Sequence, residues 1–197
     1  RVTLSKASDN YFNRYAKFMK KLIFTFITTC LLISCGEISE NADGSKTYTY
    51  NYSNGNVKKQ KHIDPKGNES WKFFHENGKI KKEGKVINNE NTGLWKFYNN
   101  SGNLLSETEF ASDSKNGSTK HYWGNGNLKG VGTYKNGNLD GVWTTYHENG
   151  QKEKEGSLNS GKEIGIWKVW TPKGELQVTV TYNNGKIVDQ QYSVVSE

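Results

Sequence analysis

The stretch GLWKFYNNSGNLLSETEF, residues 93–110, decides the fold of this protein. Its first six residues are rich in aromatic side chains, which is typical of a short β-strand. Gly102 then marks a tight turn, and a second strand is expected from Asn103 to Phe110. The stretch therefore predicts a β-hairpin.

The hairpin pattern recurs with a period of 24 residues, and Thr119 marks the one copy that lacks the tryptophan. The periodic positions are a tryptophan column (Trp71, Trp95, Trp143, Trp167), an aromatic column (Phe74, Tyr98, Tyr122, Tyr146, Trp170), a turn glycine (Gly78, Gly102, Gly126, Gly150, Gly174) and a glycine two residues before the tryptophan (Gly93, Gly117, Gly141, Gly165). Such self-similarity indicates a repeat architecture.

The repeat predicts an all-β fold, an elongated single-sheet antiparallel β-meander of about five 24-residue hairpin repeats. A half-copy at residues 48–57 lies one residue out of phase, and a final strand is expected over 187–195. Only 32% of the residues are hydrophobic, whereas 13% are aromatic. We therefore expect aromatic side chains packed between neighbouring units to supply the core.

The pattern Gly-x-Trp-x-x-Tyr, followed by Asn-Gly, a strand and Asn-Gly-x-x-x-Gly, resembles the MORN repeat in its bacterial variant form, over about residues 48–186. Similar chains are often labelled YwqK-type antitoxins of toxin–antitoxin systems. The resemblance thus implies a scaffold, with a toxin as one kind of partner. The sequence departs from the pattern at Glu69 for the leading glycine, Thr119 for the tryptophan and Lys152 in an apolar column.

The segment before the repeats is typical of an export signal. Lys20 and Lys21 precede a largely apolar run over 22–33, which is too short for a spanning helix of about 20 residues. The run ends in Leu-Ile-Ser34-Cys35, which resembles the bacterial lipobox. The resemblance implies cleavage between Ser34 and Cys35 and attachment of lipid to the cysteine sulfur. Such acylation would anchor the protein firmly in a membrane.

The sequence thus predicts three parts. Residues 1–34 are a leader and lipoprotein signal peptide, of which 1–18 precede the only methionine and are taken as an over-extended start. Residues 35–46 are the lipidated cysteine and a flexible polar tether, and 47–197 are the repeat domain. Because Gly36 replaces the aspartate associated with inner-membrane retention, the resemblance implies the outer membrane of a Gram-negative envelope, facing periplasm or medium.

The net charge of +7 does not indicate nucleic-acid binding, because most of the excess lies in the leader. Residues 1–34 hold six basic residues and one acid, whereas the remainder holds 21 lysines and 19 acids. The body contains no arginine, the residue that contacts phosphate and guanine in a bidentate manner. We expect the body lysines to be solubilising surface groups.

The sequence predicts a non-enzymatic protein without cofactor or metal. His75 and His147 occupy the same register three units apart, about 30 Å, so they are expected to be surface residues at turns rather than ligands of one metal. Glutamates of the second strands alternate with lysines, which favours a cross-strand charge ladder on the solvated face over a catalytic carboxylate pair. Neither a phosphate loop nor a nucleophile elbow is present in the sequence.

Trp123 and Trp170 lie partly outside the tryptophan column and are candidate contact residues for a partner. We expect a lipid-anchored, extracytoplasmic scaffold that binds another protein. One alternative is an antitoxin or immunity protein that neutralises a toxin, and another is a carbohydrate-binding or cell-wall-binding module.

Overall fold

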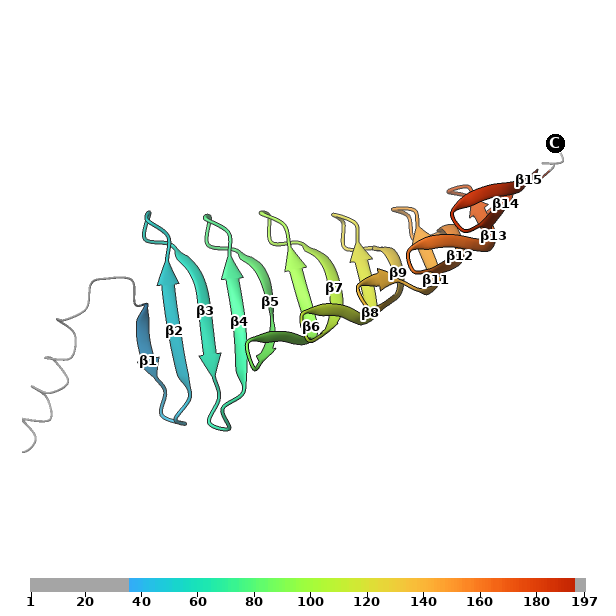
Figure 1. Ribbon diagram of the computed structural model, residues 1–197. Coiled ribbons are helices and arrows are strands. Elements are labelled where there is room, and N and C mark those ends of the chain that lie inside the picture. Colours follow the sequence, from blue (N-terminus) through green and yellow to red (C-terminus); the bar gives the residue numbers. More distant parts are fainter. Residues whose placement is uncertain (1–35, 194–197) are drawn as a thin grey trace, which may run out of the picture. The chain divides into compact units, whose positions relative to one another are not determined.

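The structure is a computed structural model that describes residues 36–193. These residues form one antiparallel sheet of 15 strands, in which successive strands are neighbours and β10 pairs only with β9 (Figure 1). The strands are β1 (Glu37–Glu40), β2 (Lys46–Asn51), β3 (Val57–Ile63), β4 (Glu69–Phe74), β5 (Ile80–Ile87), β6 (Glu90–Tyr98), β7 (Leu104–Ala111), β8 (Ser114–Tyr122), β9 (Leu128–Lys135), β10 (Asn138–Leu139), β11 (Gly141–Tyr146), β12 (Lys152–Asn159), β13 (Lys162–Trp170), β14 (Leu176–Asn183) and β15 (Lys186–Tyr192). The predicted all-β meander is confirmed.

Two kinds of turn alternate along the repeats. At one end of the strands, the His75 amide donates to the Lys79 carbonyl (2.8 Å) and the Gly78 amide donates to the His75 carbonyl (2.9 Å). Gly78 has φ +82°, a conformation that glycine adopts without strain. At the other end, two-residue turns such as Asn88-Asn89 have positive φ at both positions (52° and 66°), which suits the twist of a hairpin.

A bulge next to each two-residue turn bends the sheet. In the β5–β6 pair, Glu83 lies opposite Lys96 and Lys85 lies opposite Thr92, so that three residues of β6 face Gly84 alone. These three residues are the Gly-x-Trp motif, and extra residues of this kind bend a strand and increase its twist. Figure 1 shows β2–β4 as straight strands, whereas the strands bend near their bulged ends from β5 onward.

The bend lays a tryptophan ring on the backbone of a glycine. Trp95 is only 2% exposed, and a Cβ on Gly84 would lie 2.3 Å from its ring. Its indole N–H donates to the Lys85 carbonyl (3.2 Å). Trp167 lies on Gly156 in the same way and donates to Ser157. The predicted aromatic core is therefore largely tryptophan on glycine, with ring-to-ring contacts at its sides such as Trp95–Phe110.

A pair of threonines replaces this contact in the copy without tryptophan. Thr119 occupies the tryptophan position and Thr108 occupies the glycine position, and the two residues lie directly opposite each other. Both are buried, at 1% and 3% exposure, and their hydroxyl oxygens are 2.8 Å apart. The two side chains thus share the space that one ring fills elsewhere, so the departure at Thr119 is compensated locally.

The β3–β4 hairpin has neither the glycine nor the bulge. Gln60 and Glu69 stand at the two glycine positions, and β3 pairs with β4 without a register shift. A five-residue turn over 64–68 closes this hairpin, with Asp64 accepting from the Gly67 amide. This turn takes the place of a two-residue turn, the two extra residues of the bulge and one pair of opposite residues, as β5–β6 has them. The β3–β4 hairpin is therefore one residue shorter than a regular hairpin, which explains why the leading half-copy is out of phase.

Two predicted boundaries differ from the structure. Glu37–Glu40, assigned to the flexible tether, instead forms β1 and pairs with β2, with Ile38 opposite Tyr48 and Glu40 opposite Lys46. Its backbone pairs with β2 over all four residues, and this pairing adds the strand to the sheet. The final strand, expected from residue 187, begins at Lys186 and is described to Tyr192, while Val195 lies outside the described residues. The leader, Ser34 and Cys35 lie outside the described residues, and among residues 36–193 no helix is long and apolar enough to cross a membrane.

The threonine pair makes a testable prediction. Thr119→Trp alone should place a ring against the Thr108 side chain and lower the free energy of unfolding by about 1–3 kcal/mol. Thr108→Gly alone should also destabilise, because it removes a buried hydrogen bond. The double variant restores the glycine–tryptophan pair of the neighbouring repeats, so its loss should be smaller than the sum of the two.

Denaturant unfolding of the four proteins measures this coupling. Thr119→Trp combined with Thr133→Gly, at an exposed position of β9, is the control and should show no rescue. If the effects of Thr108→Gly and Thr119→Trp on the free energy of unfolding are additive, the glycine does not make room for the tryptophan ring and the proposed compensation is wrong.

Candidate functional site

The two faces of the sheet carry different chemistry. Trp71, Trp95 and the other column tryptophans lie on one face, which we call the tryptophan face. The opposite face carries a row of directly paired charged residues, Lys72–Glu83–Lys96–Glu107–Lys120, which we call the charge ladder. The predicted ladder of alternating lysines and glutamates is thus confirmed in this part of the sheet.

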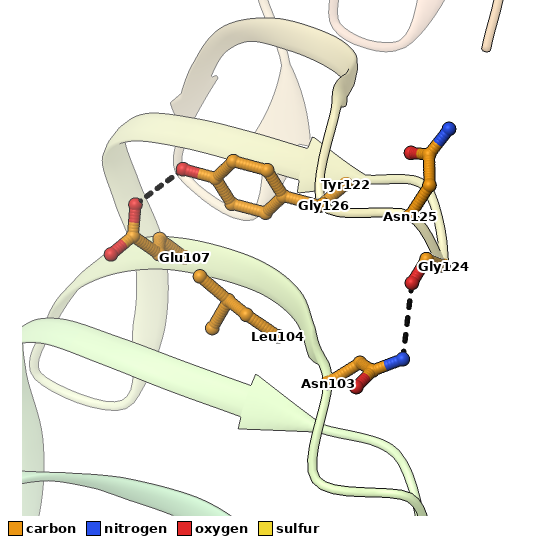
Figure 2. A pocket seen from close by; sticks show the side chains of 7 residues that line it. All are labelled: Asn103, Leu104, Glu107, Tyr122, Gly124, Asn125 and Gly126. Atoms are coloured by element: carbon orange, nitrogen blue, oxygen red, sulfur yellow. Dashed lines mark hydrogen bonds between the residues drawn. The ribbon is translucent and has the colours of Figure 1, made fainter.

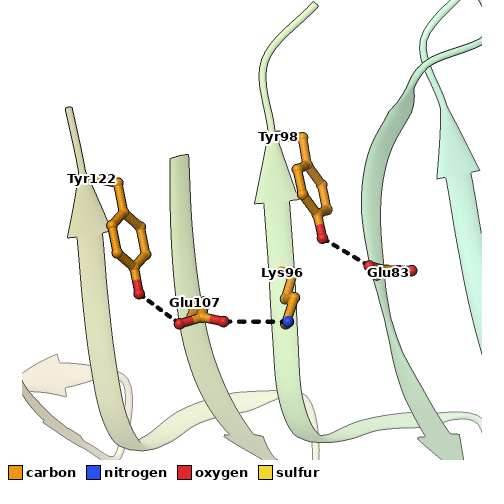
Figure 3. Close-up of polar contacts among 5 residues, drawn as sticks. All are labelled: Glu83, Lys96, Tyr98, Glu107 and Tyr122. Atoms are coloured by element: carbon orange, nitrogen blue, oxygen red, sulfur yellow. Dashed lines mark hydrogen bonds and ion pairs between the residues drawn. The ribbon is translucent and has the colours of Figure 1, made fainter. Parts of the chain in front are cut away.

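Tyrosines of the aromatic column complete the charge ladder (Figure 3). The Tyr122 hydroxyl donates to Glu107 (2.7 Å), and Lys96 lies 3.5 Å from the same carboxylate. Tyr98 donates to Glu83 in the preceding repeat (2.8 Å). Burial is the main cause that raises the pKa of Tyr98 and of Tyr122 to about 12, and the hydrogen bond to the carboxylate is the second cause. The Tyr122 bond, aided by Lys96, lowers the pKa of Glu107, so these groups are held in fixed charge states near neutral pH.

A shallow hollow lies beside the ladder, between the ends of β7 and β8 (Figure 2). Its polar groups are already bonded within the protein, since Glu107 accepts from Tyr122 and the Asn103 amide donates to the Gly124 carbonyl (3.0 Å). The residues around it are Asn103, Leu104, Glu107, Tyr122, Gly124, Asn125 and Gly126. Because these bonds join neighbouring repeats, we interpret the hollow as a seam between them.

Side chains in the longer turns tie each hairpin to the next. His75 Nε2 lies 3.0 Å from the Tyr98 carbonyl oxygen and His147 Nε2 lies 2.9 Å from that of Trp170, so each ring nitrogen must carry a proton to donate. The Trp123 indole N–H donates to the Tyr146 carbonyl (2.9 Å). These bonds give the two histidines a structural role that the sequence analysis did not foresee. Among residues 36–193, no three His, Cys, Asp or Glu side chains form a group that could hold a metal.

The tryptophan face carries the strongest candidate for a binding surface. Tyr50, Lys59, Phe73, Lys82 and Phe97 lie directly opposite one another on β2 to β6 and form a row across five strands. We call this row the lysine–aromatic strip. All five side chains are half-buried, so each keeps part of its surface in contact with solvent.

The lysines of the strip lie over aromatic rings. Lys59 Nζ is 4.5 Å from the centroid of Tyr50 and 5.1 Å from that of Trp71. Lys82 Nζ is 4.5 Å from Phe73 and 5.3 Å from Trp95. An ammonium over a ring face is attracted by the ring quadrupole, and the rings therefore position both cations.

On β7 to β11 the row is mostly small or polar, with Ser106, His121, Gly130 and Thr145. On β12 it returns to a lysine, because Lys154 lies opposite Thr145 and its Nζ is 4.4 Å from the ring centroid of Trp167. Burial, with contributions from nearby lysines, lowers the pKa of His121, whose ring lies edge-on to Trp143 at 5.7 Å. The direct alternation of aromatic residues with lysines is therefore limited to β2–β6, while Lys154 is a further lysine over aromatic rings in the same row.

The predicted contact residues lie elsewhere. Trp123 follows β8 in a turn and is half-buried, with Lys129 Nζ 4.2 Å from its ring. Trp170 ends β13 and is half-buried, with Lys152 Nζ 5.6 Å from its ring. Because β9, β11 and β12 separate their hairpins, the structure does not bring the two tryptophans together. Their role as contact residues stays a prediction.

The sequence contains a signal for the strip that periodicity alone does not reveal. In a hairpin, residues opposite each other have a constant sum of residue numbers, so an aromatic residue followed nine positions later by lysine predicts a ring beside an ammonium. Tyr50 with Lys59 and Phe73 with Lys82 fit this rule. Tyr50 and Lys59 precede Phe73 and Lys82 by 23 residues instead of 24, so the 24-residue period does not relate the two pairs.

Comparison with known proteins supports the repeat assignment. A sequence profile described as "MORN repeat variant" matches residues 70–88, 91–111, 115–136, 139–159 and 163–184, which is more than half of the chain. No curated protein matches the chain. Among solved structures, the one described as "Crystal Structure of TarM" is similar over 65% of this chain and 27% of that chain, with 15% identity and a TM-score of 0.37. A likeness at this level carries no functional argument.

The bonded carboxylate of Glu107 gives stability a predictable pH dependence. A carboxyl whose pKa is lower in the folded state stabilises the fold above its unfolded pKa, and the contribution is lost as pH falls through the folded pKa. The stability lost on Glu107→Gln should therefore be larger at pH 7 than in acid, below both pKa values. Denaturant unfolding of both proteins across this range measures the difference.

Glu153→Gln is the control, because no hydrogen bond or ion pair joins the Glu153 side chain to other residues in the 36–193 range. A cost of Glu107→Gln that does not change with pH would contradict a stabilising role of its charged form.

Proposed function

Because the chain belongs to the MORN repeat variant family, we propose that it is a non-enzymatic interaction scaffold, held on the outer side of a bacterial membrane by a lipid on Cys35. The lysine–aromatic strip is the observation that carries the proposal. It places partly exposed aromatic rings, which are enriched at protein interfaces, on an open sheet face, together with lysines that can pair with acidic groups of a partner. The other residues of the repeat array supply stiffness and reach.

The proposed anchor rests on the sequence before the sheet. Lys20 and Lys21, the apolar run over 22–33 and the Ser34-Cys35 pair follow one another in the order of a lipoprotein signal. Only Gly36 separates Cys35 from the first residue of β1. The first strands, which carry the strip, are therefore close to the proposed anchor along the chain, and a partner would be recruited to the membrane. Outer-membrane sorting is part of the same proposal.

A protein partner fits the strip better than a carbohydrate does. Sugars bind aromatic side chains by stacking on the ring faces, but Lys59 and Lys82 already lie over the rings of Tyr50, Trp71, Phe73 and Trp95. A partner that brings carboxylates can instead add to this arrangement without displacing the ammonium groups. Neutralisation of a toxin is one form that such protein binding would take.

Replacement of Cys35 tests the anchor. Cys35→Ser should abolish lipid attachment and leave the signal uncleaved, because serine lacks the thiol that receives the diacylglycerol. Detergent phase partition and the intact mass of the protein measure both effects. Cys30→Ser is the matched control, since Cys30 would be removed with the signal. Unchanged partition and mass of Cys35→Ser would refute the lipoprotein proposal.

Affinity capture tests the scaffold. The full chain is compared with the strip variant, Lys59→Glu with Lys82→Glu, and with a control variant of the same charge on the opposite face, Lys85→Glu with Lys135→Glu. Envelope proteins that bind the unmodified chain and the control variant, but not the strip variant, are expected. If the same proteins bind all three forms, the strip is not the interaction surface.

A further inference from the structure

The lysine–aromatic strip has a regular spacing that limits what can bind along it. Its five residues come from five successive strands, and neighbouring strands lie about 4.8 Å apart. Lys59 and Lys82 are two strands apart, so their stems are separated by about 9.6 Å. The rings of Tyr50, Phe73 and Phe97 repeat at the same interval, midway between the lysines.

The two strip lysines differ from those of the charge ladder. Four ion pairs join lysines to glutamates among residues 36–193, namely Lys61–Glu69, Lys72–Glu83, Lys96–Glu107 and Lys152–Glu155. Neither Lys59 nor Lys82 takes part in them. Each has its ammonium group over two rings, which position the charge but accept none of its conventional hydrogen bonds.

The surroundings of the strip favour an anionic occupant. On strands β2 to β6 the tryptophan face carries Lys46, Lys59, Lys61 and Lys82, against Glu69 as its one acid in these strands. A carboxylate placed above Lys59 or Lys82 would gain a charge-assisted hydrogen bond without competition from a bonded glutamate. The charge of the face is thus complementary to an acidic segment.

We propose that the strip binds an acidic protein segment in the polyproline II conformation, with a carboxylate at every third residue. This inference rests on the proposed function and specifies its partner. Polyproline II has three residues per turn and a rise of about 3.1 Å, so every third side chain points the same way at intervals of about 9.3 Å. That interval matches the separation of the two lysines.

Other backbone conformations fit the spacing less well. Same-face side chains of a β-strand recur about every 6.6 Å, so neither one nor two such steps reaches the second lysine. An α-helix places same-face residues about 6 Å apart at a spacing of four residues and about 10.5 Å apart at a spacing of seven, so neither value is as close to the lysine separation of about 9.6 Å as the polyproline II interval is. Proline and other apolar residues between the carboxylates would lie near the rings, as in the known docking of proline-rich segments on aromatic grooves.

Synthetic peptides test this inference with the unmodified full chain. One labelled peptide carries glutamate at every third position among prolines, and a second has the same composition with its glutamates at every second position followed by a proline run. Fluorescence anisotropy should show at least about tenfold tighter binding of the first peptide, because only it aligns two charge-assisted contacts with the lysines. Equal affinities would overturn the proposed spacing.

The variants assign the binding to the strip. The strip variant should lose at least about tenfold in affinity for the first peptide, whereas the control variant should bind as the unmodified chain does. Equal losses in the two variants would show general attraction by charge and overturn the proposal. Displacement of the peptide by vesicles of anionic lipid at lower concentration than by an unlabelled copy would also overturn it, in favour of a membrane contact.

The peptide and capture experiments test different proposals, so a negative result in one does not decide the other. Strip-dependent capture without a preference for the first peptide would leave the scaffold function standing and reject the polyproline II partner. Absence of strip-dependent capture together with equal peptide affinities would reject both. Because the two peptides are compared on the unmodified chain, the proposed spacing is tested even if the strip variant unfolds.

Discussion

The contact between an indole ring and the bare backbone of a glycine holds this fold together. A single sheet has no second layer, so its backbone can be shielded only by its own side chains. Trp95 does this for the β5–β6 hairpin by lying on Gly84, and Trp167 does it for β12–β13 by lying on Gly156. A ring can approach this closely only where no Cβ intervenes, and it reaches this place because the bulge adds residues before it. In these hairpins the bulge and the buried ring occur together, and in β7–β8 the pair Thr108–Thr119 takes the place of the ring.

Successive side chains of each strand alternate between the two faces of the sheet, and the residues on each face differ in their role. On the tryptophan face, Trp95 is buried at 2% exposure, while Phe97, two residues further along the same strand, belongs to the half-buried strip. On the opposite face, Lys96 and Tyr98 are bonded to glutamates of neighbouring strands. Lys72 and Lys96 on that face form ion pairs with glutamates of the protein, whereas Lys59 and Lys82 are positioned by rings.

The periodic residues predicted the architecture well because a hairpin repeat determines both the direction of each strand and the face of the sheet on which each side chain lies. The glycine columns at Gly78 and Gly93, the charge ladder and the meander follow from spacing and turn chemistry alone. The glycines under the rings were harder to find, since Gly84, Gly132 and Gly156 occur in only three of five copies and Thr108 compensates in another. β1 was missed because its four residues are mostly polar and gain their order from pairing with β2. The strip was missed because its first pair lies in the half-copy, where the choice of turn shifts the numbering.

The five-residue turn that causes the one-residue offset also changes the surroundings of Trp71, next to the lysine–aromatic strip. The five-residue turn at 64–68 leaves β3 and β4 without a bulge, so Trp71 has no glycine beneath it and is half-buried, stacked on Phe73 at 5.8 Å. Trp95 and Trp167 instead lie on a glycine and are buried, each at 2% exposure. The unbulged β3–β4 hairpin therefore leaves its tryptophan more exposed than Trp95 or Trp167, and it has two lysines, Lys59 and Lys61, near that ring. The departures from the repeat at Gln60 and Glu69 thus accompany a half-buried tryptophan that contacts Phe73 and lies close to Lys59 and Lys61.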